Sequence, residues 1–326
     1  MSPARGLSAA VCTRDRPELL ARALESLVAQ APAVAEILVV DNAPTDTATR
    51  SLVASRFPSV RYLAEPVQGL DFARNRALEA ATLDVVAFLD DDAVAAAGWA
   101  AALRAAFDAD ARVAICTGRV EPLSLDTPGQ RLFEANGGFS RGTERIRLPD
   151  DAHRRLHGLP APLIAWAISV GSGCSYAVRR DVARQLGGFD EALDLGPALP
   201  GGGDHDLLWR ALCAGYAVVY EPAALAWHEH RRDVEAVHDQ IIGHQRAVLA
   251  FLGKHLVRRG EPARVALAGY AGWRLAKPGV RLLRRVVRRD PLPARVLLRM
   301  WWNCWAGFVV YPRARRLAHR RRAALR

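Results

Sequence analysis

The sequence contains few cysteines, and their spacing matches no metal or redox motif. They stand far apart in the chain, at Cys12, Cys116, Cys174, Cys213 and Cys304. Because no CxxC pair and no short-spaced cluster of histidine and cysteine occurs, structural zinc is disfavoured, and nothing indicates a disulfide framework. A chain of this kind fits a reducing cytoplasm.

Further absences concern targeting and nucleotide motifs. Residues Met1–Arg5 lead directly into an expected strand, which leaves no room for the charged and apolar regions of a signal peptide. No segment offers about 18 apolar residues without a charge, so we expect no membrane-spanning helix. The chain has no GxGxxG after its first strand and no GxxxxGK followed by Ser or Thr. Dinucleotide-dependent oxidoreductases and P-loop NTPases are therefore disfavoured.

Acidic residues are scarce only in the last part of the chain. The net charge is +11. From Arg258 to the C-terminus the only acids are Glu261 and Asp290, whereas the earlier part is close to balanced. A basic tail on a nearly neutral body suggests a polyanionic partner, either nucleic acid or anionic lipid.

Strands and helices are expected to alternate through the first part of the chain. Helices are predicted to open at Pro17 and to span 69–80, between strands expected at 7–12, 36–42, 60–63 and 85–89. This alternation predicts an α/β fold with a mostly parallel sheet covered by helices on both faces. Further strands are expected at 171–178 and 215–222, before and after a helix that begins near residue 203.

Three consecutive carboxylates, Asp90, Asp91 and Asp92, follow the expected buried strand 85–89. Ionised carboxylates crowded together repel one another and lose hydration unless a cation compensates them. Carboxylate oxygens suit Mg²⁺ or Mn²⁺, which also bind phosphate oxygens. A polar turn with all three side chains in water is the alternative, and the three residues alone do not decide between the two.

Polar residues end three of the expected parallel strands. In such sheets ligands bind beyond the carboxyl ends of the strands, so residues 13–16, 41–42 and 90–92 are predicted to share one edge. Turn chemistry explains Asp or Asn at any single strand end. Three such ends in succession favour a ligand site.

The motifs at this edge resemble those of family 2 glycosyltransferases, which have the GT-A fold, a Rossmann-like sheet that binds a nucleotide sugar. The matching segments follow one another in the family's order: Cys12-Thr13-Arg14-Asp15-Arg16-Pro17, Val39-Val40-Asp41-Asn42, Gly69-Leu70-Asp71-Phe72-Ala73-Arg74-Asn75 and Phe88-Leu89-Asp90-Asp91-Asp92. The resemblance extends over roughly residues 7–255.

The resemblance implies a role for each residue of these motifs. It assigns the nucleotide base and ribose to the turn 13–16 and to Asp41, and it puts two residues of the third motif near the phosphates. The implied donor-binding set is Thr13, Arg14, Arg16, Asp41, Arg74, Asn75, Asp90 and Asp91. The implied ligands of a divalent cation, Mn²⁺ or Mg²⁺, are Asp92, Asp90 and His228, with His230 as the reserve for the histidine.

The resemblance also places a catalytic base at Asp204, where a glycine-rich segment enters a helix. Family members usually carry an acidic pair there, and its second acid deprotonates the acceptor hydroxyl. Here Gly203 replaces the first acid, so the help of a neighbouring carboxylate is expected to be lost. Asp206 in the same helix turn is interpreted as an N-cap, with a reserve role as base.

The expected organisation is a GT-A domain at 1–256 and a basic amphipathic helical tail at 257–326. The domain divides into a nucleotide-sugar half (1–118) and an acceptor half (119–256), in which 123–155 is predicted to be a mobile segment over the acceptor site. The tail interleaves arginine with apolar residues and carries Trp301, Trp302, Trp305 and Tyr311. Such a composition fits a helix lying on anionic lipid, and equally a helical pair packed on the body. Nucleic-acid binding is less favoured, because no recognised motif accompanies the charge.

The expected function is therefore inverting glycosyl transfer from a nucleoside-diphosphate sugar to a hydroxyl of a glycan, lipid-linked or cell-envelope acceptor. We expect the enzyme in the cytoplasm, peripherally bound at the inner face of the membrane. Two alternatives remain open at this stage. A sugar nucleotidyltransferase also needs acids, a cation and a nucleotide, and a non-catalytic sugar- or lipid-binding member of the fold would explain Gly203.

Overall fold

The computed structural model describes residues 4–324 apart from 198, 286, 288 and 289. Its strands are β1 (Ala4–Thr13), β2 (Glu36–Asn42), β3 (Arg61–Glu65), β4 (Leu83–Leu89), β5 (Ala93–Ala95), β6 (Val113–Pro122), β7 (Ile146–Leu148), β8 (Arg155–Leu156), β9 (Leu159–Pro160), β10 (Ser175–Arg179) and β11 (Ala217–His228). Its helices are α1 (Pro17–Val28), α2 (Ala48–Arg56), α3 (Leu70–Ala80), α4 (Trp99–Ala109), α5 (Pro128–Ala135), the 3₁₀ turn η1 (Asp150–His153), α6 (Leu163–Val170), α7 (Arg180–Gln185), α8 (Gly203–Cys213), α9 (Val234–Leu256), α10 (Arg264–Arg284) and α11 (Ala294–Ala323).

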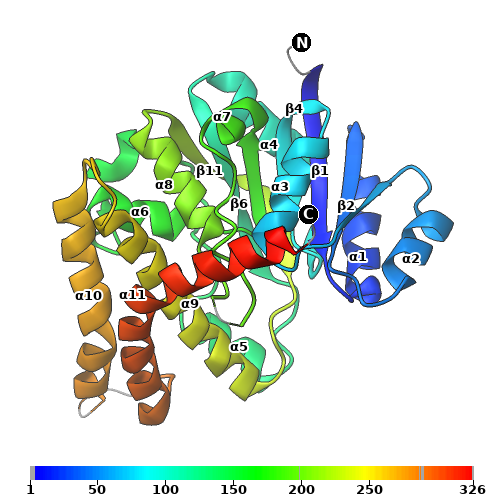
Figure 1. Cartoon of the computed structure of the whole chain (residues 1–326). Coiled ribbons are helices and arrows are strands. Elements are labelled where there is room, and N and C mark those ends of the chain that lie inside the picture. Colours follow the sequence, from blue (N-terminus) through cyan, green and yellow to red (C-terminus); the bar gives the residue numbers. More distant parts are fainter. Residues whose placement is uncertain (1–3, 198, 286, 288–289, 325–326) are drawn as a thin grey trace.

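A mixed sheet runs through the centre of the molecule in the order β3-β2-β1-β4-β10-β6-β11-β5, with β7 paired to β11 (Figure 1). The pairs β2–β3, β1–β2, β1–β4 and β6–β11 are parallel, and β10, β5 and β7 pair antiparallel to their neighbours. The α/β fold with a mostly parallel sheet is thus confirmed. Because β10 runs against β4, the start of β10 lies beside the end of β4, where Ser175 pairs with Leu89.

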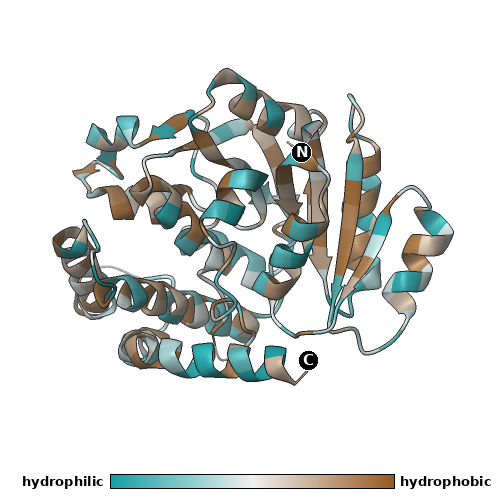
Figure 2. Cartoon of the chain, turned by 45° about the horizontal axis from the view of Figure 1, so that its top comes forward, coloured by the Kyte–Doolittle hydropathy of each residue, from teal (hydrophilic) through white to brown (hydrophobic). Residues whose placement is uncertain are grey.

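Alternate residues of each central strand enter two different cores, which is why these strands are continuously apolar (Figure 2). In β4, Val86 and Phe88 face the core under α3, α7 and α8. Val85, Ala87 and Leu89 face the core under α1 and α4. A strand segment buried on both faces is apolar at successive positions, as residues 85–89 of β4 are. Asp90, the first polar residue after this run, marks the edge of the sheet.

The segment 123–155, predicted to be a mobile segment over the acceptor site, contains regular secondary structure. It contains helix α5, which begins with a capping box in which Thr127 and Gln130 exchange side-chain and backbone hydrogen bonds. It also contains β7, which pairs with β11. Phe133 of α5 packs with Val237, Ile241 and Val296 in a separate apolar cluster, and this burial fixes the helix against α9.

The basic tail packs on the body of the protein. Figure 1 shows α10 and α11 beside α9, and α11, which contains Pro312, bends and continues across the body toward α3. Val296, Leu297, Met300 and Cys304 of α11 are buried. At its end, Arg321 donates a hydrogen bond to the carbonyl of Gln68 at 2.6 Å. One face of the tail therefore packs on the body, as the alternative to membrane binding predicted. No helix within 4–324, the unplaced positions aside, is both long and apolar enough to cross a membrane.

Candidate active site

Residues from three strand ends meet at the carboxyl edge of the sheet. Asp90 and Asp92 follow β4, Cys174 precedes β10, and His228 ends β11. One ligand atom each from Asp90, Cys174 and His228 lies within 4.8 Å of the others, and His228 Nε2 is 3.3 Å from Asp92 Oδ1. The structure thus brings together the three residues predicted to hold the cation.

The electrostatics of this group fit a divalent cation. Burial, together with repulsion by Asp92, raises the pKa of Asp90 to about 7. Burial would also raise the pKa of Asp92, but the hydrogen bond and charge of His228 lower it overall. Burial raises the pKa of the Cys174 thiol, so this sulfur stays protonated and is a poor ligand for a hard cation. The fitting donor set is therefore Asp90, Asp92 and His228.

Asp91 is held by the turn that follows β1. Thr13 Oγ1 donates a hydrogen bond to Asp91 Oδ2 at 2.7 Å, and Arg16 lies 3.3 Å from Asp91 Oδ1 and 3.6 Å from Asp92 Oδ2. Burial and repulsion by Asp92 raise the pKa of Asp91 to about 6. Arg14 in the same turn is half-exposed and lies 3.6 Å from Asp15. The turn predicted to bind the nucleotide thus also positions the acidic motif.

Asp41 presents one carboxylate oxygen without a partner. Its Oδ2 accepts a hydrogen bond from the Tyr62 hydroxyl at 2.9 Å. Its Oδ1 is buried and has no hydrogen-bond partner among the residues that the structure describes. Burial raises the pKa of this carboxyl. An acceptor of this kind suits the donor groups of a nucleoside.

A chain of hydrogen bonds behind His228 was not predicted. His228 Nδ1 lies 2.9 Å from His230 Nδ1, and His230 Nε2 lies 2.7 Å from the Glu134 carboxylate. Phe139 packs edge-on against the His228 ring, with centroids 5.1 Å apart. Glu134 lies in the segment predicted to be mobile, and no local sequence signal marks it. His230, the reserve ligand, therefore supports His228 from behind.

A second cluster contains the predicted base. Asp204 at the start of α8 accepts a backbone hydrogen bond from His205 at 2.8 Å and lies 2.9 Å from that residue's ring Nδ1. Burial would raise the pKa of Asp204, but the charges of His205 and Arg74 lower it overall. Its carboxylate is therefore ionised at neutral pH, as a proton acceptor must be.

Arg74 connects the two clusters. Its guanidinium is buried, and the charges of Asp194, Asp71, Asp204 and Asp90 overcome the effect of burial and raise its pKa. The charge of Asp90 acts on Arg74, in line with its predicted place near the acidic motif, and its place near the phosphates stays a prediction. His244 of α9, which was not predicted, lies near both clusters. The side chain of His244 is exposed to solvent.

The interpretation of Asp206 as an N-cap is wrong. Helix α8 is capped by Gly202 without a side-chain hydrogen bond. Asp206 is fully buried and binds Arg210 at 2.7 Å, Lys254 at 2.6 Å and His255 at 2.9 Å. Three cationic or hydrogen-bonding partners leave it no freedom to act as a reserve base, so it is a structural anion.

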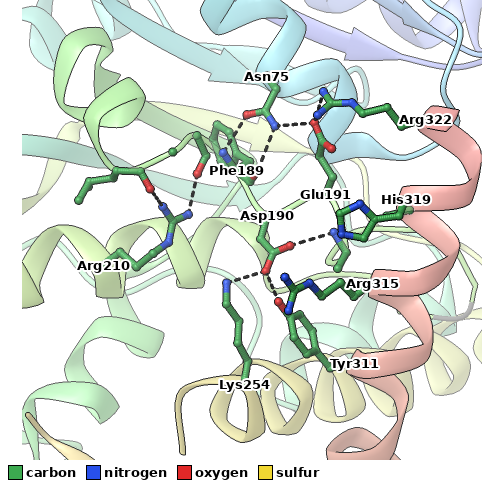
Figure 3. A pocket seen from close by; sticks show the side chains of 15 residues that line it. Asn75, Phe189, Asp190, Glu191, Arg210, Lys254, Tyr311, Arg315, His319 and Arg322 are labelled. Atoms are coloured by element: carbon green, nitrogen blue, oxygen red, sulfur yellow. Dashed lines mark hydrogen bonds and ion pairs between the residues drawn. The ribbon is translucent and has the colours of Figure 1, made fainter. Parts of the chain in front are cut away.

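Asn75 lies elsewhere than predicted. Its amide group donates to the Phe189 carbonyl at 3.0 Å and accepts from the Phe189 N–H at 2.8 Å. Figure 3 shows it at the wall of a cavity of about 510 Å³ bordered by the turn 187–192 and α11. Asp190 and Glu191 in this cavity bind Lys254 and Arg322. The amide of Asn75 is thus engaged by the turn 187–192, including the Glu191 carboxylate at 3.2 Å. No hydrogen bond joins it to Asp90, Asp91 or Asp92 among the residues that the structure describes.

The fold and the site define an α/β protein of the GT-A type. Residues 8–187 match the model of the family described as "Glycosyl transferase family 2". Because this match covers more than half of the chain, the chain belongs to glycosyl transferase family 2.

Two curated relatives extend the comparison. The chain is 34% identical over 159 residues to the pre-mycofactocin glycosyltransferase of Mycobacterium tuberculosis, covering 49% of this chain but only 30% of that protein's length. It is 29% identical over 286 residues to the succinoglycan biosynthesis protein ExoM of Rhizobium meliloti, covering 83% of this chain and 80% of ExoM.

Solved structures support the fold. The mannosyltransferase PcManGT of Pyrobaculum calidifontis, in complex with GDP-Man and Mn²⁺, superposes with a TM-score of 0.56 at 19% identity, over 96% of this chain and 88% of that one. GalNAc-T7 with UDP, GalNAc and Mn²⁺ gives a TM-score of 0.53 at 16% identity, over 81% and 53% of the two chains. Both similarities concern the fold alone.

Proposed function

We propose that this chain is a metal-dependent, inverting glycosyltransferase that uses a nucleoside-diphosphate sugar. The observation that carries the proposal is the pairing of two clusters at one sheet edge. Asp90, Asp92 and His228 form a cation-binding group, and the ionised Asp204 lies across Arg74 from it. Sugar transfer from a nucleoside diphosphate requires a cation that binds the diphosphate and, beside it, a base that accepts the proton of the acceptor hydroxyl.

In the proposed reaction, Asp204 accepts the proton of the acceptor hydroxyl. The acceptor oxygen forms a bond to the anomeric carbon, and the bond from that carbon to the diphosphate oxygen breaks. The electron pair of the broken bond leaves with the nucleoside diphosphate. A single displacement of this kind inverts the configuration of the anomeric carbon.

Asp92 and His228, with Asp90, would hold the cation. Mn²⁺ or Mg²⁺ would supply Lewis-acid stabilisation of the charge that develops on the leaving diphosphate. Both structural neighbours contain Mn²⁺ and a nucleotide or nucleotide sugar, which supports this choice of donor and cation. Arg74 is the residue of this chain that would face the same negative charge.

The acceptor is proposed to be a glycan or lipid-linked hydroxyl of the cell envelope, which the name of ExoM as a succinoglycan biosynthesis protein supports. The tail would hold the enzyme at the inner face of the membrane. One face of α11 packs on α9, but Trp301, Trp302 and Trp305 are 44%, 73% and 52% exposed. Exposed tryptophans among arginines are the composition of an interfacial helix.

The proposal is tested by screening nucleoside-diphosphate sugars for thermal stabilisation of the protein and for cation-dependent release of nucleoside diphosphate. A donor that binds the folded protein raises the midpoint temperature of the protein's thermal unfolding by mass action. We expect at least one donor to stabilise the protein and to release nucleoside diphosphate in the presence of Mn²⁺ or Mg²⁺. In EDTA we expect neither effect. Release of sugar 1-phosphate would support a nucleotidyltransferase instead, and stabilisation without turnover in the presence of acceptors would support a binding protein.

A further inference from the structure

The carboxylate of Asp71 occupies the space that a side chain at residue 203 would fill. A Cβ atom built on Gly203 would lie 1.8 Å from Asp71 Oδ2 and 2.6 Å from Oδ1. Real Cβ atoms do not approach oxygen so closely, so a side chain at 203 and the carboxylate of Asp71 exclude each other. The glycine that departs from the family pattern is thus matched by an acid on α3.

The carboxylate of Asp71 is buried and only half satisfied. Its Oδ1 accepts a hydrogen bond from Arg74 at 3.0 Å. Its Oδ2 has no hydrogen-bond partner in the part of the chain that the structure describes, and the residue is 0% exposed. A buried acceptor without a partner is costly. Burial and the charge of Asp194 accordingly raise the pKa of Asp71, and the charge and hydrogen bond of Arg74 oppose this rise.

The pair Asp71–Arg74 lies near the proposed base, and the charge of Asp204 acts on the Arg74 guanidinium. Arg74 also lies 3.5 Å from Asp194, which accepts a hydrogen bond from the Gly203 N–H at 2.9 Å. A Cβ atom on Gly173 would lie 2.7 Å from the Arg74 guanidinium and 3.0 Å from Asp204 Oδ2. Gly173 therefore leaves open the space in which Arg74 and Asp204 face each other.

We propose that Asp71 is a positioning residue for Asp204, and that it supplies from α3 the carboxylate that α8 lacks at residue 203. Asp71 holds the guanidinium of Arg74, so that Arg74 does not form a closed ion pair with Asp204. Asp204 then keeps its oxygen free for the acceptor hydroxyl. This inference rests on the proposed function, because it assigns Asp204 the role of base.

The test is an exchange of the carboxylate between the two positions. Four variants are compared with the wild type: Asp71→Ala, Gly203→Asp, the double variant Asp71→Ala/Gly203→Asp, and the control Asp71→Ala/Gly203→Asn. The control restores a side chain of the same shape without the charge. For each variant, kcat, the KM for the donor and the thermal midpoint are measured.

Both single variants are expected to lose about 10²-fold in kcat, the scale expected for a misplaced reacting group, with little change in the KM for the donor. Gly203→Asp is expected to lose activity because its side chain collides with Asp71. Asp71→Ala is expected to lose activity because Arg74 then forms an ion pair with Asp204. The double variant Asp71→Ala/Gly203→Asp should recover most of kcat and of the thermal midpoint. The Asn control should recover less of both, since an amide oxygen binds the Arg74 guanidinium more weakly than a carboxylate does.

Two results would overturn the inference. Equal recovery of kcat with Asn and with Asp at residue 203 would show that only the volume of the side chain matters there. Additive losses of kcat in the double variant Asp71→Ala/Gly203→Asp would show that a carboxylate at one position does not replace a carboxylate at the other. A wild-type protein without turnover on any donor would contradict the proposed function instead. The thermal midpoints of the same variants would then still decide whether the carboxylate can be exchanged.

Discussion

The Nδ1 atoms of His228 and His230 lie 2.9 Å apart, so one ring must donate a proton to the other. The carboxylate of Glu134 only accepts, and therefore Nε2 of His230 carries its proton. Nδ1 of His230 is then the acceptor, and Nδ1 of His228 is the donor. This order leaves Nε2 of His228 facing Asp92, to which it donates a hydrogen bond when it carries a proton. A cation bound in place of that proton would take the Nε2 lone pair as a ligand.

We predict that this chain of hydrogen bonds sets the affinity of the cation site. Glu134→Gln and His230→Phe should each weaken Mn²⁺ binding about 10–100-fold, the usual effect of removing a group that orients a ligand. Titration of Mn²⁺ by electron paramagnetic resonance measures this without turnover. His153→Phe, at an exposed histidine, is the control and should bind Mn²⁺ as the wild type does. Unchanged affinity in both test variants would exclude the orienting role.

Asp204→Asn is predicted to separate donor binding from transfer. Loss of a general base costs about 10²–10⁴ in rate, whereas the residues of the cation group are untouched. Nucleoside diphosphate should bind as in the wild type in calorimetry, while transfer is lost. Asp206→Asn does not serve as a second base variant, because Asp206 is a structural anion. Near-normal turnover of Asp204→Asn would place the base elsewhere.

Asp206 is predicted to stabilise the fold at neutral pH and to lose this effect in acid. Burial would raise its pKa, but Arg210, Lys254 and His255 lower it well below the ordinary range. A lowered pKa in the folded state gives stability that is present above about pH 4, the ordinary carboxyl range, and is lost as the pH falls further. Removing one partner of a buried ion pair costs about 3–5 kcal/mol.

Urea unfolding of Asp206→Asn at pH 7 and in acid checks this prediction. The difference in unfolding free energy from the wild type should be large at pH 7 and should shrink as the pH is lowered. Asp239→Asn is the matched control, because Asp239 pairs with Arg299 at the surface, where the two side chains are 67% and 52% exposed. Surface pairs contribute about 0–1 kcal/mol. A small, pH-independent effect of Asp206→Asn would contradict the assignment.

The tail is predicted to bind anionic membranes through the exposed face of α11. Each basic residue near an anionic surface contributes roughly 1 kcal/mol, and this attraction weakens with salt, whereas burial of tryptophan does not. Flotation with anionic vesicles should recover the wild type but not a variant with Trp301, Trp302 and Trp305 changed to Ser. Leu159→Ser, at another exposed apolar side chain, should float normally. Failure of the wild type to float, or binding that follows RNA or DNA, would contradict membrane attachment.

The sequence was sufficient to predict the features that depend on local pattern. The doubly buried strand before Asp90 and the polar strand ends at Thr13 and Asp41 are visible as an apolar run and its first polar residue. The parallel register, in which Thr13 pairs with Asp41, then brings these ends together. The predicted cation ligands came from the family resemblance, which places a histidine at the position of His228.

Features that depend on contacts between distant segments could not be predicted. Asp71 looks like an ordinary acid in the first turn of a helix, and only the packing of α3 against α8 shows that it fills the space above Gly203. Glu134 meets His230 because α5 packs on α9. Asn75 was assigned with Arg74 by the family resemblance, yet successive helix positions face different directions.

The central claim is a cation-dependent single displacement, and the product of the wild-type reaction tests it most directly. With the donor found by screening, an α-linked nucleoside-diphosphate sugar should give a β-linked product by NMR, together with one equivalent of nucleoside diphosphate. Asp92→Asn, folded but without its cation ligand, should give neither the product nor cation-dependent binding of nucleoside diphosphate in calorimetry. An α-linked product, or cation-dependent binding that is unchanged in Asp92→Asn, would contradict the account.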